Sequence, residues 1–281
     1  MKLMRVGPAG AEKPAMLDGA GVIRDISAHV ADITGEILGD EGMAKLAGID
    51  LSACPAVDAS TRIGPCVGSV KNVICVGLNY TDHAIETGNP IPTEPVLFSK
   101  AVTSLCGPND DVQMPRGSTM LDWEIELAIV IGKRTKYVSE DNALDHVAGF
   151  AVFNDVSERE FQTKRPGGQW LKGKSHETFG PLGPWMVTKD EVADPSDLAM
   201  ELKVNGNSMQ KGSTKTFIFH PATVVSHISQ YITLEPGDII PTGTPPGVGA
   251  GMNPQVFLNV GDVMELEIQG LGSQKQTVVS A

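Results

Sequence analysis

Short β-type runs separated by glycine and proline fill the chain from about residue 66 onward, and they limit the possible folds more than any other feature. β-branched and aromatic residues are common in these runs, and the glycines and prolines between them predict turns rather than long helices. One of these turns, VNGN at residues 204–207, is typical of a tight hairpin. The pattern predicts an α+β protein that is rich in β-structure and has few helices. The main runs are VKNVICVGL, PVLFSK, WEIELAIVIG, VAGFAVFND, LAMELKVNG, GDIIPTG and GDVMELEI.

The first part of the chain differs from the rest and predicts two domains. Residues 1–65 contain short alternating pieces around a DGAG turn and a probable helix near residues 35–46, and they end in the polar connector CPAVDASTRIGP. We therefore expect a small N-terminal domain over residues 1–65 and a larger domain over residues 66–281. In the larger domain the best helix candidate is residues 221–234, where proline suits the first turn and apolar residues recur at helical spacing.

Composition and charge exclude several classes of protein. The chain has 281 residues, 41% of them hydrophobic, and a formal net charge of −12 without basic clusters, which argues against nucleic acid or anionic membrane as a partner. No apolar run approaches the roughly 18 residues that a membrane helix needs, and the start lacks a signal-peptide core, so we expect a cytoplasmic protein. The four cysteines form no C-x-x-C motif and are expected to be small buried residues.

The run LDWEIELAIVIG, residues 121–132, carries three acids on a strand face that then continues with apolar residues. Glu124 and Glu126 are two residues apart, so in an extended strand they point the same way, with Cβ atoms roughly 6 to 7 Å apart. The next apolar run ends on Asp155. Burying such charges requires arginine partners, proton uptake or a hard cation, and three carboxylates suit Mg²⁺ or Mn²⁺. A solvated strand face is the alternative that these residues alone leave open.

A second polar group follows the run VICVGL. His83 and Glu86 lie three residues apart, which places them on one face of a helical turn. A histidine that a carboxylate orients is a candidate general base, although a surface histidine and a solvated glutamate would give the same pattern. The flanking Gly88-Asn89-Pro90 predicts a segment that can move over a site.

Several segments together resemble the fumarylacetoacetate hydrolase family, in order and at similar spacing, over about residues 70–275. The resemblance includes bacterial acylpyruvate and diketo-deoxy-sugar-acid hydrolases and ureidoglycolate lyase-like members. It implies a rolled, mixed β-sandwich around a divalent metal, Mg²⁺ with Mn²⁺ or Ca²⁺ as alternatives, and usually a homodimer. The segments are GLNYTDHAIE, EPVLFSK, DWEIELAIVIG, FAVFNDVSERE, QWLKGKSHETFGPLGPW, VNG and PTGTPPGVG.

The resemblance also implies roles for particular residues. The metal ligands fall on Glu124, Glu126 and Asp155, and the catalytic pair falls on His83 and Glu86. The other positions are a catalytic Lys174 and the substrate-binding residues Arg159, Gln162 and Thr244, while Tyr80 and Lys100 match motif positions without an assigned role.

These parts predict a hydrolase that cleaves the C–C bond of a 2,4-diketo acid and releases pyruvate through a metal-stabilised enolate. The resemblance implies that the substrate is an acylpyruvate, with a 2,4-diketo-3-deoxy sugar acid as the leading choice. Loops 163–169 and 249–255 are expected to decide specificity at the far end of the substrate. The same site would also suit an isomerase, a decarboxylase or a ureidoglycolate lyase. A different class remains open as well, a non-enzymatic protein with a structural Ca²⁺ or Mg²⁺ site.

Overall fold

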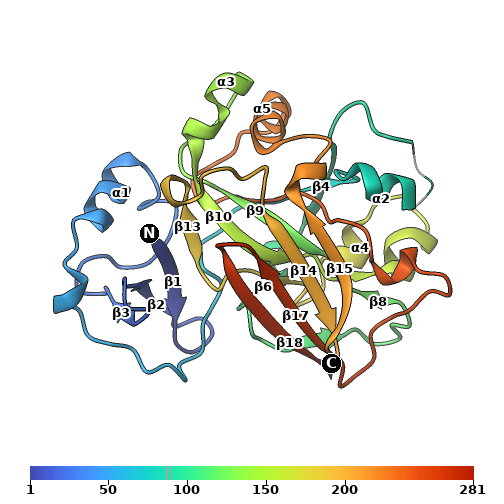
Figure 1. Cartoon of the computed structure of the whole chain (residues 1–281), viewed down its shortest axis with the longest axis horizontal. Helices are drawn as coiled ribbons and strands as arrows, with labels where there is room; N and C mark the ends of the chain where they lie inside the picture. Colours follow the sequence, from blue (N-terminus) through green and yellow to red (C-terminus); the bar gives the residue numbers. More distant parts are fainter. Residues whose placement is uncertain (87, 89) are drawn as a thin grey trace.

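A large mixed sheet runs through the middle of the computed structural model, which describes residues 1–86, 88 and 90–281 (Figure 1). Within these residues the sheet has nine strands in the order β3-β2-β1-β13-β10-β9-β16-β4-β5. Most neighbours are antiparallel, but β16 and β4 run parallel. The strands are β1 (Lys2–Val6), β2 (Lys13–Leu17), β3 (Ile23–Asp25), β4 (Val73–Gly77), β5 (Val96–Lys100), β9 (Ile125–Ile131), β10 (Val147–Asn154), β13 (Met186–Thr188) and β16 (Ile239–Pro241).

A second sheet packs against the middle of the first and contains the C-terminal strands (Figure 1). In the described part of the chain its order is β15-β14-β17-β18-β7, and two short ladders, β11-β8 and β12-β6, complete the β-structure. The prediction of a β-rich fold with packed sheets is confirmed. The strands are β6 (Leu105–Cys106), β7 (Val112–Met114), β8 (Leu121–Asp122), β11 (Ser157–Glu158), β12 (Gly180–Pro181), β14 (Ala199–Val204), β15 (Asn207–Ser213), β17 (Val263–Ile268) and β18 (Gly272–Ser280).

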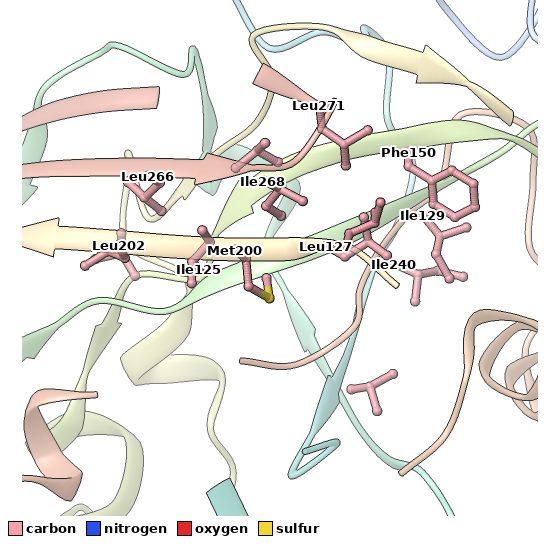
Figure 2. Packing of buried hydrophobic residues seen from close by; sticks show 14 of the residues in the cluster. Ile125, Leu127, Ile129, Phe150, Met200, Leu202, Ile240, Leu266, Ile268 and Leu271 are labelled. Carbon is pink, nitrogen blue, oxygen red and sulfur yellow. The ribbon is translucent and has the colours of Figure 1, made fainter. Parts of the chain in front are cut away.

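The central strand β9 is buried along its whole length, which explains why its sequence is apolar on both faces. On one face, Ile125 and Leu127 share a core with Met200 of β14 and Ile268 of β17 (Figure 2). The other face, which continues the line of acids, packs against a different set of residues. There Ala128 and Val130 share a core with the N-terminal segment, including Leu3, Ile26 and Ile33.

The N-terminal segment is joined to the rest by backbone hydrogen bonds as well as by this core. Strand β1 pairs with β13 and β2, so β1 to β3 extend the large sheet (Figure 1). One sheet therefore passes through residues 1–65 and the rest of the chain. The predicted domain boundary at residue 65 stays a prediction.

Helices are short and few. Among the described residues they are α1 (Asp40–Ala47), α2 (Thr81–Glu86), α3 (Glu140–Ala143), α4 (Leu171–Lys174), α5 (Pro221–Tyr231), the π-helical turn η4 (Glu160–Lys164) and the 3₁₀ turns η1 (Leu51–Ala53), η2 (Val102–Ser104), η3 (Leu144–His146), η5 (Lys189–Glu191), η6 (Thr214–Thr216) and η7 (Gly249–Gly251). Helix α1 begins five residues later than residue 35, and α5 ends three residues before residue 234. The early end follows from Ile232, whose backbone is extended, and from Leu234, which bridges to Thr135.

Two sequence expectations about local structure are confirmed. Asn205 and Gly206, with φ of 52° and 78°, turn the chain between β14 and β15 as a hairpin of this kind requires. All four cysteines are buried and free. As for membrane crossing, none of the helices that the structure describes has both the length and the apolarity for it.

Candidate active site

Three carboxylates meet where β9 and β10 run side by side. Glu124 lies in the break between β8 and β9, Glu126 lies within β9, and Asp155 directly follows β10. The antiparallel pairing places Phe153 opposite Glu126, and the amide of Asp155 donates to the carbonyl oxygen of Glu124 at 2.9 Å. One oxygen from each of the three carboxylates lies within 4.8 Å of the others, and all three residues are buried. The convergence predicted from their spacing is confirmed.

Three cations surround these acids. Lys174 Nζ donates to Glu124 at 2.8 Å and to Asp155 at 2.7 Å, and Lys100 Nζ pairs with the other oxygen of Asp155. Arg159 pairs with Glu124 through Nη1 at 2.6 Å. Its neighbours in sequence bind other groups, because Glu158 accepts from the amides of Met120 and Phe161 and Glu160 pairs with Arg165.

Asp122 has a different role from the two glutamates that follow it. Its fully buried carboxylate accepts from Arg159 Nε at 2.7 Å and from the backbone amides of Gly249 and Ala250 at 2.7 and 2.9 Å. It also accepts from the amide of Trp123 at 2.9 Å. Asp122 therefore ties Arg159 to the loop around residue 249, and it does not join the carboxylates that converge.

The charges and donors at this point fit a divalent cation. With all four carboxylates ionised, as they would be around a bound cation, they outnumber the three cations and leave one negative charge in the cluster. Burial and the repulsion of Asp155 and Glu124 hold the pKa of Glu126 well above its usual value. Glu124 differs, because burial is outweighed by Lys174 and Arg159, which lower its pKa to about 2. Oxygen donors with excess negative charge are what Mg²⁺, Mn²⁺ or Ca²⁺ requires, so the residues fit such an ion.

The predicted base lies in the same cavity. Helix α2 carries His83, whose Nδ1 is 2.9 Å from Glu86 Oε2, and the other oxygen of Glu86 accepts from the amide of Gly247 at 3.0 Å. His83 is buried and lines, together with Glu124 and Glu126, a cavity of about 400 Å³. The predicted mobility of residues 88–90 stays a prediction, since Thr87 and Asn89 lie outside the described residues.

The remaining predicted residues also reach this cavity. It is lined by Arg159, Gln162, Lys174 and Thr244, while Asp155 is fully buried behind it. Gln162 accepts from Arg159 Nη1 at 3.0 Å. The Thr244 hydroxyl donates to the carbonyl oxygen of Ile125 at 2.8 Å, and this hydrogen bond stabilises the start of β9. Their substrate-binding roles stay predictions.

One polar atom in this cluster is left over. Arg159 is buried, yet its Nη2 has no hydrogen-bond partner among the residues that the structure describes. Buried donors are normally paired, so an orphan donor at a cavity wall indicates a position for an anionic or carbonyl oxygen.

Sequence reasoning missed three supporting residues. The resemblance assigns no role to Lys100, although a lysine closing the apolar run PVLFSK signals a buried charge. The sequence pattern does not separate Asp122 from the other acids, and it gives no prediction for Gln210. Gln210 accepts from the amide of Ile125 at 3.0 Å and donates to Thr244 at 2.8 Å. Both predicted specificity loops do reach the cavity, through Thr163 and Lys164 on one side and Ala250, Gly251 and Gln255 on the other.

Comparison with known proteins agrees with this architecture. A family model described as fumarylacetoacetate (FAA) hydrolase C-terminal matches residues 72–279. A protein of Burkholderia orbicola strain MC0-3, whose name proposes a hydrolase, is 54% identical over 282 residues, with 100% of each chain covered.

Two solved structures extend the comparison. The 2-hydroxyhepta-2,4-diene-1,7-dioate isomerase of Mycobacterium marinum is 33% identical with a TM-score of 0.79, covering 100% of this chain and 98% of that one. The maleylpyruvate hydrolase of Sphingobium sp. SYK-6, in complex with manganese(II) ion and pyruvate, is 28% identical with a TM-score of 0.82, and each chain is covered completely. The model match spans most of the sequence, and the acidic cluster lies inside the matched region. The chain therefore belongs to the fumarylacetoacetate hydrolase family of enzymes.

Proposed function

We propose that the protein is a metal-dependent hydrolase that cleaves an acylpyruvate and releases pyruvate. The observation that carries this proposal is one cavity lined by the His83 imidazole, two of the three converging carboxylates and the guanidinium whose Nη2 is unpaired. Hydrolysis of a 2,4-diketo acid needs three parts, which are a general base, a cation site and a hydrogen-bond donor for an anionic oxygen. The name of the Sphingobium relative, a hydrolase in complex with manganese(II) and pyruvate, supports the same reaction.

The ion is proposed to be Mg²⁺, held by Glu124, Glu126 and Asp155, and when bound it would supply positive charge to the carboxylate and 2-oxo oxygens of the substrate. The orphan Nη2 of Arg159 is available to the same carboxylate. Lys174 keeps its ammonium charged, since Asp155 and Glu124 outweigh burial and raise its pKa. It therefore stabilises negative charge that develops on the departing fragment.

His83 is proposed to activate the water. Because Glu86 accepts the proton on Nδ1, Nε2 keeps the lone pair that takes a proton from water. The water oxygen then forms a bond to C4, and the bond between C3 and C4 breaks. Its electron pair passes to C3, which becomes the methyl carbon of pyruvate when His83 returns the proton. The acyl group leaves as a carboxylic acid.

The test is pyruvate release from purified protein with Mg²⁺, Mn²⁺ or Ca²⁺. Substrates are acylpyruvates, a 2,4-diketo-3-deoxy sugar acid and oxaloacetate, with pyruvate detected by a coupled dehydrogenase, and ureidoglycolate, whose cleavage is followed by the release of glyoxylate. Glu124→Ala should abolish release, and His83→Ala should lower kcat by roughly 10²- to 10⁴-fold, the usual contribution of a general base. Lys172→Met is the control, because Lys172 is exposed and outside the cavity lining.

An isomerase is the second candidate, because a named isomerase shares the fold at 33% identity. It would change the absorbance of an unsaturated 2-oxo diacid without releasing pyruvate. If folded Glu124→Ala and His83→Ala both keep wild-type hydrolysis, the proposed mechanism is wrong. Tight binding of the ion without turnover of any substrate would favour a structural ion site.

A further inference from the structure

Three cationic side chains line the cavity, and one differs from the others. Arg159 and Lys174 are neutralised by the acids around them. Lys164, at the end of η4, is exposed, and its Nζ lies 3.1 Å from the sulfur of Met120. A thioether is a weak acceptor. Within residues 1–86, 88 and 90–281, no carboxylate forms an ion pair with Lys164.

The depth of these groups gives the cavity two ends. Glu124 and Glu126 are buried, whereas Lys164 and its neighbour Thr163 are exposed. The inner end therefore holds the converging acids, and the rim carries the lysine.

An apolar wall begins at the inner end. The Lys174 ammonium lies 5.3 Å from the centre of the Phe98 ring, and Phe98 contacts Trp170 edge-on with ring centres 5.0 Å apart. Trp170 packs so closely over Gly77 that a Cβ there would be 2.7 Å from its ring. Leu78, Met120 and Val248 also line the cavity.

We propose that Lys164 is a specificity-determining residue that binds a second carboxylate, so that the substrate is an acylpyruvate whose acyl arm ends in an acid. The inference rests on the proposed function, which places the 2-oxo acid end at the buried acids. Charge supports it. With its four carboxylates ionised around a bound ion, the cluster at the inner end has a net charge of −1, so a divalent ion and one substrate carboxylate neutralise it. Lys164 is then the remaining cation of the lining, and a second carboxylate neutralises it.

The wall also limits what lies between the two carboxylates. Hydroxyl groups of a sugar acid lose hydrogen bonds to water on entering the cavity and need polar partners in return. Phe98, Trp170 and Met120 offer few such partners, so a saturated or unsaturated hydrocarbon arm matches this wall of the cavity. The polar partners of the lining, Gln162, Thr163, Thr244 and Gln255, come from other segments.

Binding tests the inference without turnover. Two probes share one carbon skeleton and lack the 4-oxo group, 2-oxoheptanedioate with a terminal carboxylate and 2-oxoheptanoate with a terminal methyl. Calorimetry with Mg²⁺ should give wild-type protein a preference for the diacid of about tenfold, as expected for one charge-assisted hydrogen bond. Lys164→Met should abolish the preference, Lys164→Arg should keep it, and the control Lys172→Met should not change it.

The kinetic test uses succinylpyruvate and butyrylpyruvate, the matching pair with the 4-oxo group. Lys164→Met should raise KM for succinylpyruvate by about tenfold, leave kcat nearly unchanged, and leave butyrylpyruvate unaffected. If wild-type protein binds both probes equally, or Lys164→Met keeps the preference, the inference is wrong even if pyruvate is released. If the preference depends on Lys164 but neither substrate is cleaved, the binding of a second carboxylate by Lys164 holds and the proposed hydrolysis is wrong.

Discussion

The role of Asp122 gives the sharpest prediction, because its buried carboxylate accepts four hydrogen bonds. Asp122→Asn keeps the shape but replaces one oxygen by an amino group. Whichever way the amide turns, two of the four donors lose their acceptor. A buried donor without a partner costs about 1–3 kcal/mol, so two cost roughly 2–6 kcal/mol. A separate estimate gives a similar loss, because removing one partner of a buried ion pair usually destabilises the folded protein by about 3–5 kcal/mol.

The lower part of that range is expected, since Arg159 keeps Glu124 as a partner at 2.6 Å. We therefore predict a loss of about 3 kcal/mol in the free energy of unfolding, measured by urea titration. Glu160→Gln is the matched control. It breaks a carboxylate–arginine pair in the same segment, but Arg165 is half exposed, so the loss should be no more than about 1 kcal/mol.

Activity should change as well. Asp122 positions Arg159 and the loop at Gly249, so kcat/KM of the folded variant should fall by roughly 10²-fold, as a misplacement of about 1 Å can cause. Measurement in low urea, with circular dichroism at the same protein concentration, separates this loss from unfolding. A variant that unfolds within about 0.5 kcal/mol of wild type and keeps full activity would refute the reasoning.

Four further predictions follow from the described contacts. Gly77→Ala should push Trp170 into the cavity and raise KM several-fold with little change in the urea midpoint, since a Cβ there meets the ring at 2.7 Å. Mg²⁺ at about 100 times its Kd should stabilise the protein by about 2.7 kcal/mol in thermal unfolding, and Glu126→Gln should reduce that gain. Leu127→Ala in the fully buried core should cost about 2–5 kcal/mol of unfolding free energy. Burial raises the pKa of the Cys66 thiol to about 12, so Ellman's reagent at pH 8 should leave it unmodified until guanidinium unfolds the chain.

The strands and the acidic cluster could be predicted from the sequence because both depend on short-range pattern. Alternation over residues 125–131 identifies a strand, and the two-residue spacing of Glu124 and Glu126 points them the same way. The hairpin at Asn205 follows from a turn signal of two residues.

The partners of those acids could not be predicted from the sequence. Asp155 and Lys100 are 55 residues apart, and their contact depends on the order of strands in the sheet. The neighbours that bury Ala128 could not be predicted either, because they belong to the distant N-terminal segment. Local pattern shows that a residue is buried, but only the topology shows what buries it.

The two carboxylate oxygens of Glu86 contact different groups, and this has a consequence for the chemistry of the site. One oxygen contacts the His83 ring and the other accepts from the amide of Gly247, so a single side chain joins helix α2 to the loop around residue 247. Displacement of this loop would shift the Glu86 carboxylate that contacts the imidazole. In the proposed mechanism, proton transfer by His83 would therefore depend on the correct position of the loop around residue 247.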